Sequence, residues 1–246
     1  MAEPTNSLGL TSPWMNAAGF MGYLPQAQAA ERFIPGAFVT NPISLEARSP
    51  ARERIVKPYA GDFLLHTGHP NPGIKSVLHQ YAQKWKNLSM PVWAHLLVSG
   101  PYDCEQMVRE MEGCENVTAV ELGLPPGMGL KNQLETVKAA VGELPVMVCL
   151  PLDEINHVLV DQLAGLSEIG LVLAAPGGVL VEHGRLVRGR LFGPGLFPQM
   201  MAGLMRWRGA GIPLVAGAGI FSRESGEEAL QAGAAAVQVD GWCWKF

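Results

Sequence analysis

Short apolar runs alternate with amphipathic stretches along most of the chain, and glycine or proline usually separates them. Runs that are apolar on both faces are typical of buried parallel strands, and the amphipathic stretches between them are typical of covering helices. The runs that fit this pattern are 14–19, 37–40, 92–96, 118–122, 146–150, 171–174, 214–217 and 236–239. Eight parallel strands close an α/β TIM barrel, (β/α)8, that is filled by its own side chains. A doubly wound open sheet is the alternative.

The amphipathic stretches predict the helices that cover such a sheet. They are residues 26–32, 76–87, 103–111, 133–141, 155–166, 196–207 and 222–231. Ser76 is placed to cap the second of these helices.

Two segments depart from the regular repeat. After the second strand, residues 44–57 are rich in basic residues and proline and predict a loop. Residues 62–73 begin like a strand but continue as turn residues, which predicts an excursion over the barrel mouth. After the sixth strand, two alternating apolar runs flank Glu182-His183-Gly184 and predict a hairpin.

The chain after the eighth run is too short for the eighth helix of a complete barrel. Only residues 241–246 follow, among them Trp242, Trp244 and Phe246. Three aromatic rings bury less apolar surface than a three-turn helix. We therefore expect a homodimer or a hetero-complex through the face that contains the C-terminus.

Composition narrows the functional classes. The chain has 246 residues, 48% of them hydrophobic, and suits a single domain over 1–246. A net charge of −4 without a run of basic residues makes nucleic acid and membrane unexpected partners. No long apolar segment or secretory signal is evident, so we expect a cytoplasmic protein. The four cysteines form no C-x-x-C pair, which predicts free thiols.

Polar residues stand at the ends of several predicted strands. In parallel barrels the loops at the carboxyl ends of the strands build the active site. The residues in these positions are Asn16, Asn41, His95, Glu121, Cys149 and Asp240, with His66 and His69 in the excursion. Each could simply be solvated, or together they could form a small-molecule or metal site. No metal-ligand spacing supports the metal, so we predict none.

Three of these residues are the candidate catalytic groups. His95, Glu121 and Cys149 are titratable side chains expected at one mouth. The basic residues Arg48, Arg52, Arg54 and Lys57 fit a solvated loop, although a loop at this end of the barrel could also clamp an anion.

Seven short motifs, in order, resemble those of the dihydroorotate dehydrogenase family, the flavin-dependent barrels of pyrimidine synthesis. They are SPWMNAAG (12–19), VTNPIS (39–44), GHPNPG (68–73), VELG (120–123), VCLP (148–151), RLFGPG (190–195), and AGAGI (216–220) with AAAVQVDG (234–241). The sixth is similar to the family's G-L-S-G-P-A, which also follows a hairpin. The resemblance covers nearly the whole chain.

The resemblance implies a barrel that binds FMN at its mouth. The FMN-binding positions that it implies are Ala17, Ala18, Gly19, Thr40, Asn41, Gly193, Gly217, Gly219 and Asp240. In the family the FMN phosphate lies on backbone N–H groups of the last two strand-to-helix turns, which form an electropositive nest.

The family's chemical residues are replaced in this chain. Asn41 and Cys149 stand where the family has lysines, and Leu65 and Gly123 stand where it has asparagines that read the substrate. The position of the base falls in residues 124–127, where no side chain can take a proton. Asp240 takes a glycine position, and a carboxylate beside a phosphate is repulsive by several kcal/mol in a poorly solvated site.

These replacements set the functional expectation. We expect weak or absent FMN binding and no oxidation of dihydroorotate. The leading hypothesis is a flavin-type oxidoreductase scaffold that acts on another small molecule. The alternative is a non-redox barrel that has lost FMN and serves as a binding protein or as a subunit of a complex.

Overall fold

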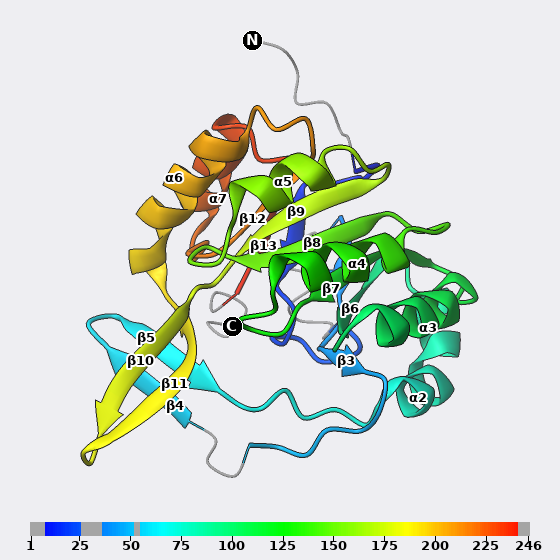
Figure 1. Ribbon diagram of the computed structural model, residues 1–246, viewed down its shortest axis with the longest axis horizontal. Helices are drawn as coiled ribbons and strands as arrows, with labels where there is room; N and C mark the ends of the chain where they lie inside the picture. The colour runs from blue at the N-terminus through cyan, green and yellow to red at the C-terminus, as the bar shows by residue number, and fades with distance from the viewer. Residues whose placement is uncertain (1–7, 26–35, 52–54, 241–246) are drawn as a thin grey trace.

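The computed structural model describes residues 8–25, 36–51 and 55–240 (Figure 1). Some sequence-based expectations lie outside the described residues. They are the helix at 26–32, the placement of Arg52, Arg54 and Cys243, and the missing eighth helix.

Eight parallel strands form the barrel that the sequence predicts, so the open doubly wound sheet is wrong. In spatial order they are β1 (Trp14–Asn16), β13 (Ala236–Val239), β12 (Leu214–Gly217), β9 (Ile169–Ala174), β8 (Val146–Pro151), β7 (Val117–Gly123), β6 (Val92–Leu97) and β2 (Phe38–Val39). A parallel bridge between Met15 and Ala37 joins β1 to β2 and completes the ring. A further short strand, β3 (Ile43–Ser44), extends the pairing along β6.

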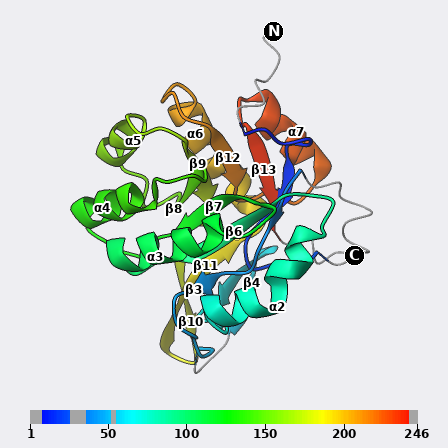
Figure 2. The same ribbon diagram turned by 90° about the vertical axis from the view of Figure 1, so that its right-hand side faces the viewer.

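Helices lie around the outside of the strands (Figure 2). They are α2 (Ile74–Lys86), α3 (Pro101–Glu112), α4 (Leu130–Ala140), α5 (His157–Leu163), α6 (Phe197–Trp207) and α7 (Arg223–Gln231), with a 3-10 turn, η1 (Pro194–Leu196), before α6.

Two expected boundaries are wrong. Gly73, and not Ser76, is the N-cap of α2. Helix α5 is shorter than 155–166 because the Asn156 side chain caps it by accepting the Val158 N–H at 2.8 Å. No helix in the described part of the chain is long and apolar enough to cross a membrane.

The barrel interior is filled by one inward layer of apolar side chains. Its members are Met15, Ala37, Val39, Trp93, Ala119, Met147, Val172, Val215 and Ala236. Because side chains alternate across a strand, the residue two positions later on each strand points inward one layer nearer the mouth. On β6, β7, β8 and β13 that layer holds His95, Glu121, Cys149 and Gln238. The sequence therefore places these four side chains directly above the apolar layer that fills the barrel.

The two departures from the barrel repeat meet in a second sheet. Residues 44–57 are not only loop, because β4 (Ile55–Tyr59) forms a hairpin with β5 (Asp62–His66). The predicted second hairpin is present as β10 (Gly177–Glu182) and β11 (Arg185–Phe192). Strand β11 pairs with β10 along 185–190 and with β5 along 190–192, which gives the order β10-β11-β5-β4. In Figure 1 these strands project from the barrel at lower left.

Asn16 closes the barrel at its weakest seam. Strands β1 and β2 share only one backbone bridge, and the Asn16 amide adds the pairing that they lack. Its Nδ2 donates to the Val39 carbonyl at 2.6 Å, and its Oδ1 accepts the Val39 N–H at 3.0 Å. The Asn16 side chain, which we expected at the barrel mouth, therefore joins β1 to β2.

We predict that Asn16→Ala lowers the free energy of unfolding by about 2–5 kcal/mol, because it leaves a buried N–H and a buried carbonyl of Val39 without partners. Urea unfolding followed by circular dichroism measures the change. The control is Asn132→Ala on the exposed face of α4, which should alter stability by no more than about 0.5 kcal/mol. An equal effect of the two substitutions would contradict the role of Asn16.

Candidate functional site at the barrel mouth

A buried carboxylate lies at the centre of the candidate site. Glu121 on β7 is 1% exposed, and its two oxygens have different partners. His95 Nδ1 on β6 lies 2.5 Å from Oε1, and Gln238 Nε2 on β13 donates to Oε2. Because an unpaired buried charge is very costly, these two partners make the carboxylate tolerable inside the barrel. The network joins strands on different sides of the barrel.

The orientation of His95 follows from its neighbours. A carboxylate only accepts hydrogen bonds, so Nδ1 carries the hydrogen and Nε2 is the basic atom of the neutral ring. Gly123 leaves room for that atom, since a Cβ at this position would lie 2.8 Å from His95 Nε2. The backbone N–H of His95 donates to the Thr40 Oγ1 at 3.0 Å. Gly123, where the resemblance has an asparagine, thus accommodates the imidazole.

Cys149 on β8 lies in the same layer but differs in chemistry from His95 and Glu121. Burial raises the pKa of its thiol well above the usual range, the negative charge of Glu121 raises it further, and the positive charge of Arg190 offsets part of the rise. The residue is half-buried. At neutral pH the thiol therefore stays protonated and is a poor nucleophile. The structure brings the three expected catalytic residues together, and their catalytic roles stay predictions.

Positive groups gather above this layer. Burial, together with the charges of His95, Arg190, Arg48 and His66, lowers the pKa of His69 to about 4. His69 is exposed in the loop after β5, where water screens the neighbouring charges. After burial, the contributions of Arg190 and Arg48 to this shift show that both guanidinium groups lie near His69.

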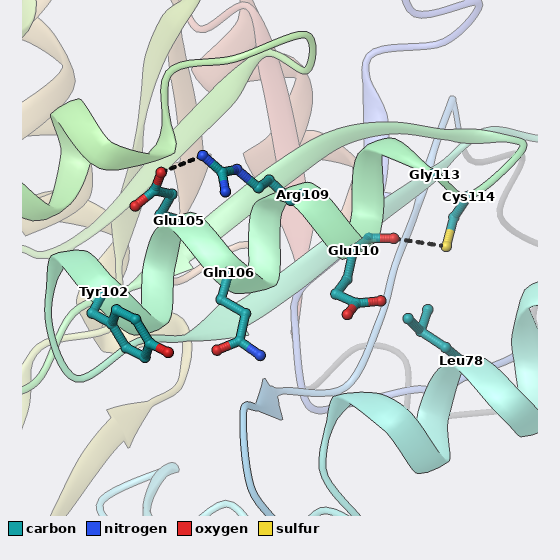
Figure 3. Close-up of a pocket in the computed structure, with 8 residues that line it drawn as sticks. All are labelled: Leu78, Tyr102, Glu105, Gln106, Arg109, Glu110, Gly113 and Cys114. Carbon is teal, nitrogen blue, oxygen red and sulfur yellow. Dashed lines mark hydrogen bonds and ion pairs between the residues drawn. The ribbon is translucent and has the colours of Figure 1, made fainter.

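A separate hollow lies outside the barrel, between α2 and α3 (Figure 3). Its volume is about 550 Å³, and it is lined by Leu78, Tyr102, Glu105, Gln106, Arg109, Glu110, Gly113 and Cys114. None of the residues singled out from the sequence lines it. Its position on the helical layer, away from the strand ends, separates it from the candidate site.

Comparisons with known proteins agree with the barrel architecture. No family model matches the chain. It is 26% identical over 255 residues to the putative dihydroorotate dehydrogenase A (fumarate) of Aeropyrum pernix, covering 94% of this chain and 82% of that protein. It is 25% identical over 264 residues to the catalytic subunit of dihydroorotate dehydrogenase B (NAD(+)) of Trichlorobacter lovleyi, covering 97% of this chain and 86% of that protein.

Solved structures show the same fold. The dihydroorotate dehydrogenase of Eimeria tenella, solved in complex with ferulenol, matches 92% of this chain and 75% of its own with a TM-score of 0.72 at 14% identity. FabK from Thermotoga maritima matches 99% of this chain and 63% of its own with a TM-score of 0.55 at 14% identity. Over most of its length the chain is thus similar to proteins named dihydroorotate dehydrogenase, at 25–26% identity, and it shares their barrel fold.

The positions that the family resemblance assigns to FMN at the first two strands make internal contacts in this chain. The Ala17 N–H donates to the Val239 carbonyl at 2.8 Å, and Ala18 and Gly19 form the turn that follows. Thr40 is fully buried against His95. Asn41 binds Gly22 twice, accepting its N–H at 3.0 Å and donating its own N–H to the Gly22 carbonyl at 2.7 Å. Asn41 therefore holds a loop.

The glycines expected at the FMN phosphate are needed for packing. A side chain on Gly193 would collide with Asp62, and one on Gly219 would collide with the backbone of Phe197. Gly217 lies against Val172, whose Cγ1 would be 2.8 Å from an added Cβ. The space next to each of these glycines is therefore occupied by other atoms of the protein.

Asp240 decides the fit of the cofactor. Its side chain is 0% exposed at the end of β13, where the resemblance requires a glycine under the phosphate. A buried carboxylate there repels a dianionic group, and the positions of the family's lysines hold Asn41 and Cys149, which bring no compensating cation. Asn41, Cys149 and Asp240 therefore do not supply the groups that the resemblance expects around the FMN phosphate.

Two residues of the site were missed from the sequence. Gln238 was read only as part of a motif, although its place between two apolar residues of β13 signals an inward polar side chain. Arg190 is the first residue of the RLFGPG motif, and its position near Cys149 depends on the pairing of β11 with the distant strand β5, which no local pattern reveals.

We predict that Cys149 reacts with iodoacetamide more slowly at about pH 8 than an ordinary cysteine, because only the thiolate is nucleophilic. Glu121→Gln should accelerate the reaction by removing a negative charge, and Arg190→Gln should slow it by removing a positive one. Peptide mass spectrometry measures alkylation of Cys149, with Glu105→Gln on the surface of α3 as the control. Identical rates in all variants would show that these charges do not act on the thiol.

Proposed function

We propose that the chain uses its dihydroorotate dehydrogenase-like oxidoreductase scaffold to act on a small molecule other than dihydroorotate, with His95 and Glu121 as an acid–base pair. The observation that carries the proposal is the buried network of His95, Glu121 and Gln238 at the carboxyl ends of the strands. In barrel enzymes this end of the sheet is where catalytic groups lie.

The network can move a proton at one defined atom. Glu121 fixes the His95 ring through Nδ1 and stabilises the imidazolium that forms when Nε2 takes a proton. Gln238 fixes the other carboxylate oxygen, so the carboxylate does not rotate away from the ring. His95 Nε2 can therefore accept a proton from a bound molecule and return it, as general acid–base catalysis requires. None of these three roles involves FMN.

Dihydroorotate itself is not supported as the substrate. Leu65 and Gly123 replace the asparagines that the resemblance expects, and neither side chain can bind a carboxylate or an amide. The segment expected to carry the base, residues 124–127, is Leu-Pro-Pro-Gly. The new acid–base pair instead lies in the layer immediately beneath.

We predict no turnover of dihydroorotate with fumarate, NAD or a quinone as acceptor, because the substrate-reading residues and the family base are absent. Spectrophotometric assays of orotate formation test this, with an authentic dihydroorotate dehydrogenase as the positive control. Once an activity is found, His95→Gln and Glu121→Gln should each lower kcat by about 100-fold or more. An activity unchanged in both variants would refute the acid–base assignment.

A second candidate function is a non-redox binding protein or a subunit of a complex. The observation that favours it is the buried Asp240 carboxylate at the phosphate end of the cofactor position. The two candidates differ in whether substitution of His95 abolishes a reaction or leaves a binding function intact.

We predict that the purified protein lacks the visible absorbance of an oxidised flavin and gains no bound FMN on incubation, because of the charge conflict at Asp240. The double substitution Asp240→Gly with Cys149→Lys should strengthen FMN binding by removing an anion and adding a cation. Fluorescence titration with FMN measures it, and Asp103→Gly with Cys114→Lys, on the surface near α3, is the matched control. Stoichiometric flavin that survives gel filtration of the unsubstituted protein would contradict this prediction.

A further inference from the structure

Arg190 reaches the barrel mouth from the projecting sheet. It stands where β11 leaves one partner strand for another, opposite Gly177 on β10 and opposite Leu65 on β5. Its guanidinium NH1 donates to the carbonyl of Ala175 at 3.1 Å. Ala175 directly follows β9, so this bond fixes the guanidinium at the carboxyl end of a barrel strand.

Arg48 and two histidines lie around the same opening. Two backbone hydrogen bonds of 2.9 and 3.1 Å hold Arg48 to Asn71, and the Asn71 side chain is itself bonded to Ser44. His66 ends β5, the strand that pairs with Arg190's own strand, and His69 follows it in the loop. Asn71 lies two residues after His69, so its bonds to Arg48 hold Arg48 beside the same loop.

Two carboxylates in this region, Glu121 and Asp153, have other partners. Glu121 is held by His95 and Gln238, and Asp153 accepts the N–H of Gly177 at 3.2 Å. Within residues 8–25, 36–51 and 55–240, no ion pair joins Arg48 or Arg190 to a carboxylate. A planar guanidinium presents its donors as a fork that matches a carboxylate or a phosphate. The rim of the mouth is therefore positive and suited to an anion.

We propose that Arg190, supported by Arg48, is the anion-binding residue of this barrel, and that the small molecule of the proposed function carries a carboxylate or phosphate group which these residues bind. The inference rests on the proposed function for the identity of the site, but the binding itself requires no turnover. Arg190 occupies the first position of the RLFGPG motif, where the resembled motif has glycine, while Asn41 and Cys149 occupy the positions of lysines. The positive charge of the site has moved from the barrel strands to the hairpin.

Binding of simple anions tests the proposal directly. The probes are benzoate, inorganic phosphate and benzamide, the last being a neutral isostere of benzoate, measured by isothermal titration calorimetry. The unsubstituted protein should bind at least one anion and not benzamide. Arg190→Gln should weaken anion binding about tenfold or more, because a hydrogen bond to a charged group is lost. Arg190→Lys should fall between the two, since it keeps the charge and loses the fork.

Arg188→Gln is the matched control, because Arg188 is exposed on the same strand two residues earlier. It should change anion affinity less than about twofold. Circular dichroism confirms that each variant is folded. Benzoate binding alone identifies a carboxylate, and phosphate binding alone identifies a phosphate. Failure of both anions to bind, equal weakening by Arg188→Gln and Arg190→Gln, or equal binding of benzamide would each overturn the proposal.

His95→Gln separates this inference from the proposed function. It should lower turnover, while anion affinity falls less than in Arg190→Gln, because Arg190 and not His95 supplies the bidentate donors. If anions still bind and His95→Gln does not change turnover, the acid–base role of His95 is refuted. The anion site at Arg190 is then retained. Loss of anion binding in His95→Gln as large as that in Arg190→Gln would instead overturn the assignment of the anion to Arg190.

Discussion

The structure depends on closing the barrel between β1 and β2, the two shortest of its strands. Sheet hydrogen bonds cannot supply this closure alone, because a single bridge between Met15 and Ala37 connects the strands. Asn16 supplies both a donor and an acceptor to Val39 and so replaces a missing backbone pair. An open edge would expose unpaired N–H and carbonyl groups of both strands. With the ring closed, every inward side chain faces the same enclosed space, and the polar layer at the mouth becomes possible.

Enclosure then determines which polar residues that layer can hold. A carboxylate inside a barrel must find partners on other strands, because water does not reach it. Glu121 finds one on the neighbouring strand β6 and one on β13, which is separated from β7 by several strands in the sheet order. The network therefore connects β6, β7 and β13, and the geometry of the barrel fixes where His95 and Gln238 lie relative to Glu121. A site built on strands in this way is held more rigidly than one built on loops.

The sequence predicted the barrel because parallel strands that are apolar on both faces leave a clear local signal, and the strand positions from Val92 onward agree closely with the structure. It also predicted that His95, Glu121 and Cys149 meet, since the carboxyl ends of parallel strands share one rim. The second sheet escaped prediction because β5 and β11 are far apart in the chain, and such pairing has no local pattern. For the same reason Arg190 was not placed at the mouth.

Compared with the motifs that it resembles, this chain has a positive charge on the hairpin strand β11, at Arg190, and none at positions 41 and 149 of the barrel. A lysine on a barrel strand is held by the rigid sheet, whereas Arg190 depends on the pairing of β11 with β5 and on a single bond to the Ala175 carbonyl. The proposed acid–base pair lies on the barrel strands, so the proposed proton transfer and anion recognition come from different sheets. A change in the register of the hairpin would then move the anion relative to His95 without disturbing the His95–Glu121 contact. In the proposed arrangement the pairing of two distant hairpins sets the position of the anion, and the closed ring beneath them carries the acid–base pair.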